Sequence, residues 1–329
     1  MISAQAPYGR LVRKGLVKAG SRKPWAILLT LVIGILAAGC ADLEKNLTEN
    51  KELEANQEPT KNKELVIGDI GWDESVAISN LTKALLEDEL GYDSVELKTL
   101  GVASLFERVG SGELDAFQDV WIPDHQEHLS RVESNVELLD PWYRDTTRVG
   151  IAVPSYMNIS SIPQLNLTAV EEIGGIKPEA AISKRISEVV IPTYHLKQEY
   201  SAWDAPAAML FEVNKRIRNG EAFAFVAWSP HWMNEEYDLV YLDDPEGALG
   251  ELDEPSRITT VVRGGFANDE PVAYAFMRAL SLTEEQVNDL EGAINSGGDP
   301  LLGARTWAEN NRDVVQPWID AAKQAPQEP

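Results

Sequence analysis

Residues 64–90 read ELVIGDIGWDESVAISNLTKALLEDEL, and this stretch contains the repeating unit of the fold. The run at 64–70 is short and apolar, as is typical of a buried strand, and Gly71 marks a turn. From 74 to 90 the apolar residues recur at helical spacing, and Asp73 is the expected N-cap. The stretch therefore predicts a strand that leads directly into a helix.

The same alternation continues along the chain and predicts an α/β fold with largely parallel sheets. Further strands are expected at 94–100, 114–120, 148–154, 200–203, 222–227 and 258–264, with helices between them and a helical tail from 270 to about 323. Two α/β sets, the second inserted into the first, predict two lobes with a ligand cleft between them, a periplasmic-binding-protein-like fold of type II. We expect lobe I to comprise 64–150 plus 256–329 and lobe II to comprise 151–255.

The N-terminal region has the features of an export signal. Six Lys and Arg residues fall within the first 23 positions, and the apolar run WAILLTLVIGIL (25–36) follows them. A basic region, a short apolar core and small residues predict a secretory signal peptide over 1–39. The sequence LAAGC (36–40) resembles the lipobox of bacterial lipoproteins, which implies lipidation of Cys40, although Ala37 stands where Leu is commoner.

Residues 40–63 are rich in Glu, Lys, Asn and Gln and contain almost no large apolar side chains. Such a segment buries too little surface to offset its ordering entropy, so it is expected to be a disordered tether. Signal, lipidated cysteine and tether together predict an exported domain anchored by lipid to the outer face of the cell membrane.

Composition excludes several classes of function. The net charge of −24 argues against nucleic acid, because phosphate binding requires clustered Lys and Arg. With one cysteine the chain is expected to form no internal disulfide. The four histidines lack the carboxylate or cysteine neighbours of a metal site, so we expect neither a metal nor a cofactor.

Three tryptophans are expected directly after strands, where α/β sheets bind ligands. They are Trp72, Trp121 and Trp228. One such residue would be read as core packing, but three at equivalent positions predict the wall of a pocket. Indole faces attract a quaternary ammonium ion, which has no N–H to donate, at about 0.5–2 kcal/mol per contact. A tryptophan cage of these three residues is therefore suited to methylated amines.

Three segments carry a family resemblance: GDIGWDESVAISN (68–80), LDAFQDVWIPDH (114–125) and AFVAWSPHWMNEEYDLVYLDDP (224–245). They resemble glycine betaine and proline betaine substrate-binding lipoproteins of ABC transporters, the ProX/OpuAC type, over about residues 64–318. The resemblance implies two α/β lobes that close on a betaine. It also implies partners: a small-molecule ligand, an ABC permease with its ATPase, and the membrane through the lipid anchor.

The resemblance also implies roles for single residues. Trp72, Trp121 and Trp228 match the cage, and His125 matches a histidine that hydrogen-bonds the ligand carboxylate. The turn GIKPEAAISK (175–184) matches a glycine-rich turn whose amides bind the same carboxylate, and the corresponding donors are Ala181 and Ile182. Here Glu179 and its neighbours depart from the usual Gly-x-Gly and add a negative charge, although a helix N-terminus binds an anion without glycine.

Two other classes of function remain open. Ser229 and His231, two positions apart, suggest a hydrolase on the same scaffold, but no Gly-x-Ser-x-Gly elbow supports a catalytic triad. A ligand-sensing lipoprotein without a transport partner would have the same sequence features as a transport protein. The sequence favours a non-enzymatic binding protein for glycine betaine or a relative. Choline, which lacks a carboxylate, is disfavoured by the roles of His125 and the turn.

Overall fold

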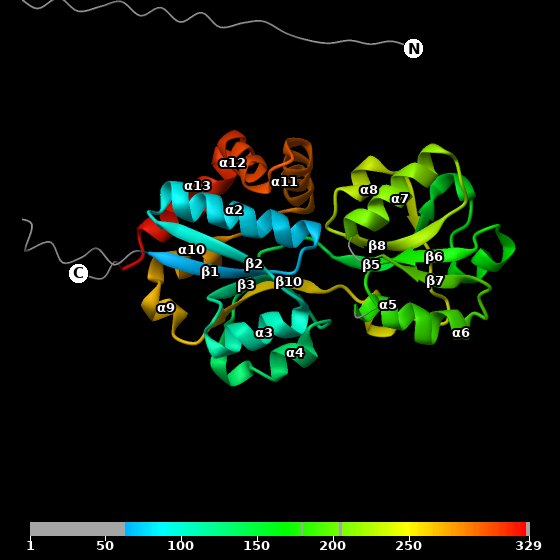
Figure 1. The fold of residues 1–329 in the computed structure, drawn as a ribbon, viewed down its shortest axis with the longest axis horizontal. Helices are drawn as coiled ribbons and strands as arrows, with labels where there is room; N and C mark the ends of the chain where they lie inside the picture. The colour runs from blue at the N-terminus through cyan, green and yellow to red at the C-terminus, as the bar shows by residue number, and fades with distance from the viewer. Residues whose placement is uncertain (1–62, 179, 204–205, 327–329) are drawn as a thin grey trace, which may run out of the picture. The chain divides into compact units, whose positions relative to one another are not determined.

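The computed structural model describes residues 63–178, 180–203 and 206–326 (Figure 1). The predicted signal peptide (1–39), the predicted lipidation site Cys40 and all but the last residue of the predicted tether (40–63) lie outside this part of the chain. Among the residues described, no helix has both the length and the apolar character needed to span a membrane.

The first sheet has five strands in the order β2-β1-β3-β10-β4. Strands β2, β1 and β3 are parallel, whereas β10 runs antiparallel to both β3 and β4. The strands are β1 (Glu64–Asp69), β2 (Ser94–Thr99), β3 (Ala116–Ile122), β4 (Val136–Leu138) and β10 (Arg257–Arg263).

The second sheet repeats this topology in the order β7-β6-β8-β5-β9. Its first three strands are parallel, and β5 runs antiparallel to β8 and β9. The strands are β5 (Arg148–Pro154), β6 (Glu172–Gly175), β7 (Glu199–Ala202), β8 (Ala224–Ser229) and β9 (Leu239–Tyr241). The two α/β sets are thus confirmed, and each sheet is largely parallel as expected, because only its fourth strand, β10 or β5, runs against the other four. The fourth strand of each sheet is reached without the helical crossover that a parallel pairing requires.

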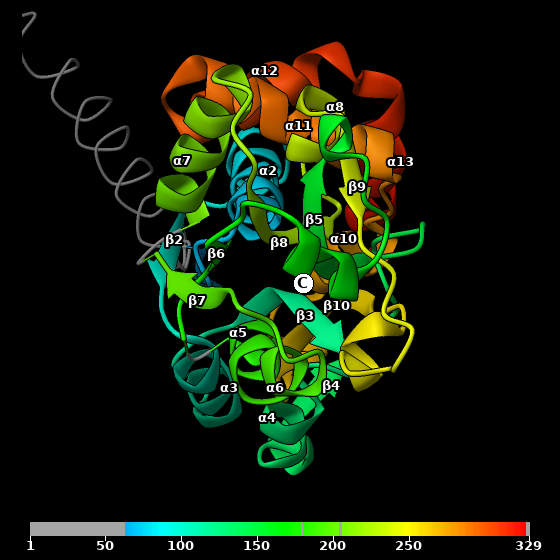
Figure 2. The ribbon, with the colours of Figure 1, turned by 90° about the vertical axis from the view of Figure 1, so that its right-hand side faces the viewer.

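Helices cover both faces of each sheet. In Figure 1 α3 and α4 lie on one face of the first sheet, and α2 with the C-terminal helices lies on the other; α5 and α6 lie opposite α7 on the second sheet, as Figure 2 also shows. The helices are α2 (Asp73–Glu89), α3 (Val102–Ser111), α4 (Gln126–Ser130), α5 (Ala181–Arg185), α6 (Ile191–Thr193), α7 (Pro206–Arg218), α8 (Met233–Glu236), α9 (Phe266–Asp269), α10 (Pro271–Ala279), α11 (Glu284–Gly297), α12 (Pro300–Asn310) and α13 (Arg312–Lys323), with a π-helical turn, η4 (Ile186–Val190), between α5 and α6.

Helix α2 begins one residue earlier than expected. Its N-cap is Trp72, in extended conformation, and Asp73 lies in the first turn, so the predicted Asp73 cap is wrong. The physical reason is that the Asp73 carboxylate is used elsewhere, in contacts with His231 and Trp232. Gly71 makes the sharp turn from β1 into α2 with a φ of +82°, a conformation that other residues adopt at a cost.

Strand β3 carries one extra residue relative to its partner β10. Thr259 pairs with Val120 and Val261 with Phe117, so two residues of β3 stand opposite one of β10. Phe117 and Val120 consequently both face the cluster beneath α3, while Trp121 packs in the main core on the α2 side. A bulge of this kind re-aims the side chains that follow it.

Three further tryptophans lie in the core. Trp142 is 1% exposed, and its indole N–H donates to the backbone oxygen of Gln118 at 2.6 Å. Trp307 and Trp318 are buried in α12 and α13. The ring of Trp142 is therefore enclosed and its only polar atom is satisfied, so it packs as a core residue.

Candidate functional site

Two of the three predicted cage residues lie inside strands and not after them. Trp121 pairs with Ile258 of β10, and Trp228 pairs with Val149 of β5, so both strands extend past the expected end. Both side chains are buried, at 3% and 5% exposure, whereas Trp72 is half-buried. In each case the tryptophan is followed by one residue and then a cis-proline, Pro123 or Pro230.

Trp72, Trp121 and His125 lie together. The rings of Trp72 and His125 have centroids 6.2 Å apart and are tilted by 39°. The backbone N–H of Trp121 donates to His125 Nδ1 at 3.2 Å, and the backbone N–H of His125 donates to the Trp121 backbone oxygen at 2.7 Å. The turn at the end of β3 thus fixes the imidazole beside Trp72 and Trp121.

His125 is held as a neutral hydrogen-bond donor. Burial, together with the nearby His128, lowers its pKa to about 3. Because Nδ1 accepts the Trp121 amide, the single proton of the neutral ring resides on Nε2. No described residue accepts a hydrogen bond from Nε2. The ring can therefore donate one hydrogen bond to an anionic group at any pH well above 3.

Each of the two buried indoles donates its N–H to a buried carboxyl group. Trp121 Nε1 donates to Asp119 Oδ1 at 2.7 Å, and Trp228 Nε1 donates to Glu74 Oε2 at 3.2 Å. Glu74 lies in the first turn of α2, two residues after Trp72. The end of β8 is thus joined to the helix that Trp72 caps, and the Trp72 ring lies beside His125, which is bonded to Trp121.

The pKa values of these acids are raised. Burial raises the pKa of Asp119 to about 7, against the lowering effect of the Trp121 hydrogen bond, and Asp69 adds to the rise. Burial and the charges of Asp119 and Glu291 hold the pKa of Glu74 well above its usual range. Burial raises the pKa of Asp69 to about 6. Sequence reasoning missed these acids, although an Asp within the apolar run AFQDVW was a detectable signal.

The segment after β8 is bonded to α2 and α11. Trp232 Nε1 donates to Asp73 Oδ1 at 3.1 Å, and the Trp232 backbone N–H donates to Glu291 Oε2 at 2.7 Å. His231 Nε2 lies 3.3 Å from Asp73 Oδ2, and its ring meets the Trp228 ring edge-on at a centroid distance of 4.7 Å. These contacts fix the orientation of Trp228 from behind.

The predicted carboxylate turn is well ordered by hydrogen bonds but is not joined to the tryptophans. Ser183 Oγ donates to the backbone oxygen of Ile176 at 3.0 Å, and the Tyr200 hydroxyl donates to Ser183 Oγ at 2.6 Å. Ala181, exposed, and Ile182, buried, begin α5. Among the described residues no hydrogen bond links either of them to Trp72, Trp121 or Trp228. Glu179 lies outside the described residues.

Ser229 and His231 do not form a hydrogen-bonded pair. The Ser229 hydroxyl donates to Glu284, and His231 Nδ1 accepts the Met233 backbone N–H at 3.1 Å. With Nδ1 occupied and Nε2 facing Asp73, the histidine has no atom directed at the serine. This geometry lacks the nucleophile–base contact that a triad requires.

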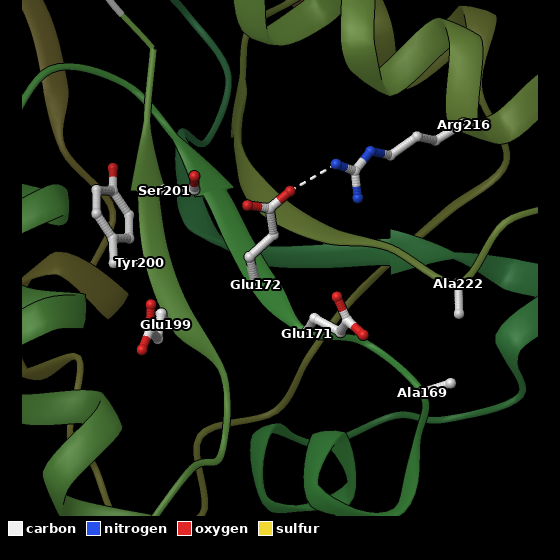
Figure 3. Close-up of a pocket in the computed structure, with 8 residues that line it drawn as sticks. All are labelled: Ala169, Glu171, Glu172, Glu199, Tyr200, Ser201, Arg216 and Ala222. Atoms are coloured by element: carbon white, nitrogen blue, oxygen red, sulfur yellow. Dashed lines mark hydrogen bonds and ion pairs between the residues drawn. The ribbon is translucent and has the colours of Figure 1, made fainter.

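A pocket of about 390 Å³ lies elsewhere, at the edge of the second sheet (Figure 3). Its polar lining includes Glu171, Glu172, Glu199 and Arg216, and Glu172 points at Arg216 to form an ion pair. None of the predicted site residues lines it. Acids there are exposed or half-buried, so solvent satisfies them and the pocket needs no ligand.

Comparisons with known structures agree with this fold. Lactococcal OpuAC, in its closed-liganded conformation with glycine betaine, is 29% identical, with a TM-score of 0.68 over 78% of this chain and 99% of that one. ProX from Borrelia burgdorferi is 24% identical, with a TM-score of 0.68 over 79% of this chain and 99% of that one. The fold is thus that of type II substrate-binding proteins.

Sequence comparison gives the family. The glycine betaine/carnitine transport binding protein GbuC of Listeria monocytogenes is 32% identical over 164 residues, which cover 49% of this chain and about half, 51%, of that relative. The family described as the substrate binding domain of ABC-type glycine betaine transport systems matches residues 63–310. Since this match covers most of the chain, the protein belongs to the family of substrate-binding domains of ABC-type glycine betaine transport systems.

Proposed function

We propose that this protein captures glycine betaine or a closely related quaternary ammonium compound in the tryptophan cage and delivers it to an ABC permease. The observation that carries the proposal is the gathering of Trp72, Trp121, Trp228 and His125 around the first turn of α2. Large aromatic faces beside one neutral hydrogen-bond donor match the two ends of a betaine, a methylated cation and a carboxylate.

In this proposal the two ends of the ligand are recognised by different physics. The trimethylammonium group binds to indole faces, which supply a negative quadrupole and an apolar surface. The carboxylate accepts a hydrogen bond from His125 Nε2–H and from the amides of Ala181 and Ile182 at the start of α5. Trp121 lies in the first sheet and Trp72 at the start of α2, which covers that sheet, whereas Trp228 lies in the second sheet, so full binding energy requires residues of both lobes.

The remaining parts of the proposal concern location. Lobe I (64–150 plus 256–329) and lobe II (151–255) follow a signal peptide and a tether, and Cys40 carries the lipid that anchors the domain outside the cell membrane. The ligand-bound form is the one that the permease recognises, and the protein does no chemistry on the ligand. Lipidation at Cys40 is tested by mass spectrometry of the membrane-bound protein and of a Cys40→Ala variant.

Titration of the protein with glycine betaine, followed by tryptophan fluorescence and calorimetry, tests the ligand assignment. We expect saturable binding to the parent and none detectable to Trp121→Ala. Trp318→Phe, which removes a core indole 6.4 Å from Phe276, is the matched control and should bind as the parent does. Betaine binding by a folded Trp121→Ala variant at parental affinity would overturn the assignment.

A further inference from the structure

Two buried acids stand directly behind the cage. Glu74 and Asp119 are both 0% exposed, and each uses one carboxyl oxygen to accept an indole N–H, from Trp228 and Trp121 respectively. The indole rings are thus oriented by groups that can exist in a charged or a neutral form. Neither tryptophan could rotate about its side-chain bonds without giving up a buried hydrogen bond.

The second oxygen of each acid has no partner. Glu74 Oε1 and Asp119 Oδ2 are buried and make no hydrogen bond to any described residue. Neither carboxyl group takes part in an ion pair within the described part of the chain. An ionised carboxylate in such surroundings would be buried without compensation, at a cost of several kcal/mol in order of magnitude.

The groups that face the two acids are mostly acidic themselves. Asp69 from β1 acts on Asp119, and Glu291 from α11 acts on Glu74. Asp73, beside Glu74 on α2, faces Glu291 and is paired with His231 from the segment after β8, and Glu235 from α8 also acts on Glu291. Like charges at close range cannot all ionise, so the cluster retains protons near neutral pH.

We propose that Glu74 and Asp119 are positioning residues, at least one of which is protonated in the ligand-free protein. One proton is released from this pair when a quaternary ammonium ion enters the cage. In this step one carboxylic O–H bond breaks, its electron pair stays on the oxygen, and the proton passes to solvent. The inference rests on the proposed function, and it adds that the two carboxyl groups bonded to the indoles respond to the charge of the ligand.

The physical argument is linkage. A cation placed against the Trp121 and Trp228 rings stabilises the ionised form of the acids behind them, and the resulting carboxylate in turn stabilises the cation. Burial raises the pKa of Asp119 to about 7, so protons remain to be released at pH 6–7. Release of one proton makes affinity rise by up to about tenfold per pH unit, levelling off above pH 7.

Isothermal titration calorimetry of the full chain at pH 6.5 tests this. Binding heats for glycine betaine are measured in phosphate and in Tris, whose ionisation heats differ, and the difference gives the number of protons released. The matched ligand is 3,3-dimethylbutanoate, which has the same shape and carboxylate but carbon in place of the ammonium nitrogen. We expect release of up to about one proton with betaine and no release with the isostere.

Variants locate the proton. Asp119→Asn and Glu74→Gln keep an acceptor for the indole N–H but cannot titrate, so release should fall in each and vanish in the double variant. Glu172→Gln, in the remote pocket of Figure 3, should release as the parent does. Where a variant fails to fold, the parental affinity for betaine between pH 5.5 and 7.5 replaces it, and a pH-independent affinity overturns the inference.

The outcomes separate the two proposals. Betaine binding with equal heats in both buffers, or with unchanged proton release in the folded double variant, would disprove the proton-release step and leave the ligand assignment intact. Failure of the parent to bind betaine under any of these conditions would overturn both. Equal proton release with 3,3-dimethylbutanoate, which lacks the cationic group, would show that ligand shape and not the ammonium charge drives the titration, and would overturn the inference.

Discussion

Strands β3 and β8 occupy the same third place in their sheets, and each ends in a tryptophan, one further residue and a cis-proline. Their partners differ. The Trp121 indole is held by Asp119 of its own strand, whereas Trp228 has Val226 at the equivalent position and takes Glu74 from α2. One end is locally complete, and the other depends on a helix distant in sequence.

The histidines that follow also differ in use. His125 spends Nδ1 on the Trp121 amide and keeps Nε2 available, whereas His231 uses Nδ1 for Met233 and turns Nε2 toward Asp73. In the proposed site the shared pattern therefore supports two tasks: the end of β3 would present a hydrogen-bond donor to the ligand, and the end of β8 holds the Trp228 ring in place. Equivalent sequence positions do not imply equivalent chemistry.

The largest expected effect that would test this comparison comes from truncating each tryptophan. Trp228→Ala leaves Glu74 without its indole donor and should lower the free energy of unfolding by about 3–5 kcal/mol. Each kcal/mol lost should lower Tm by about 2–4 °C. Trp121→Ala should cost a similar amount. Thermal denaturation followed by circular dichroism measures both, and a Tm within 2 °C of the parent for either would contradict the packing described.

The two histidines should give opposite results. His125→Ala removes the proposed hydrogen bond to the ligand carboxylate, which is worth about 1.5–3 kcal/mol of binding free energy. Betaine binding should therefore weaken about 10- to 100-fold, with little change in Tm. His231→Ala removes a contact of Asp73 and should lower Tm while weakening binding less. Calorimetry and denaturation on the same samples decide, and equal effects on affinity would refute the division of tasks.

Asp119 should make the stability of the protein depend on pH, whereas β8 has no acid at the equivalent position. Asp119 has a folded pKa of about 7, raised by burial above its ordinary value of 3.8, so the native state binds more protons between these values. Its contribution to stability is full below about pH 4 and is lost as pH rises through 7. Asp119→Asn should therefore gain Tm relative to the parent at pH 8 more than at pH 5. The reverse order would show that Asp119 is ionised in the native state.

The smallest effect is expected at Ser229. Ser229→Ala removes the hydroxyl that donates to Glu284, at about 0.5–1.5 kcal/mol, and should leave betaine affinity within twofold of the parent. Chromatography of betaine after incubation with either protein should recover it unchanged. Conversion of the ligand by the parent, abolished in the variant, would revive the hydrolase alternative.

Much of the fold could be predicted from the sequence because periodicity reports burial. The strand at 148–154, for example, follows directly from its apolar run and matches β5. The strands β4, β6 and β9 have three or four residues each and were missed, since so short a run carries no clear period. The direction of β5 and β10 was also missed. Each of these strands follows a strand of the other sheet, so the local sequence does not report its direction.

The aromatic residues of the candidate site were predicted from the sequence, but the buried acids that hold them in place were not. Trp72, Trp121 and His125 were named from their places beside strands, and the structure brings them together. The roles of Glu74 and Asp119 were missed. The apolar run around Asp119 was a signal of burial, but nothing in the sequence singles out Glu74 among 53 acidic residues. Only tertiary contact distinguishes Glu74 from acids on the surface.

The extra residue of β3 sets a counting rule for relatives of this protein. If this residue were kept but paired regularly, the odd-even alternation of the strand would turn Trp121 toward α3, on the far side of the sheet from α2. A homologue that lacks one residue between the equivalents of Phe117 and Val120 therefore keeps its tryptophan on the α2 side within a regular strand. An alignment assigns the faces of this strand end correctly only if it places the gap inside the bulge.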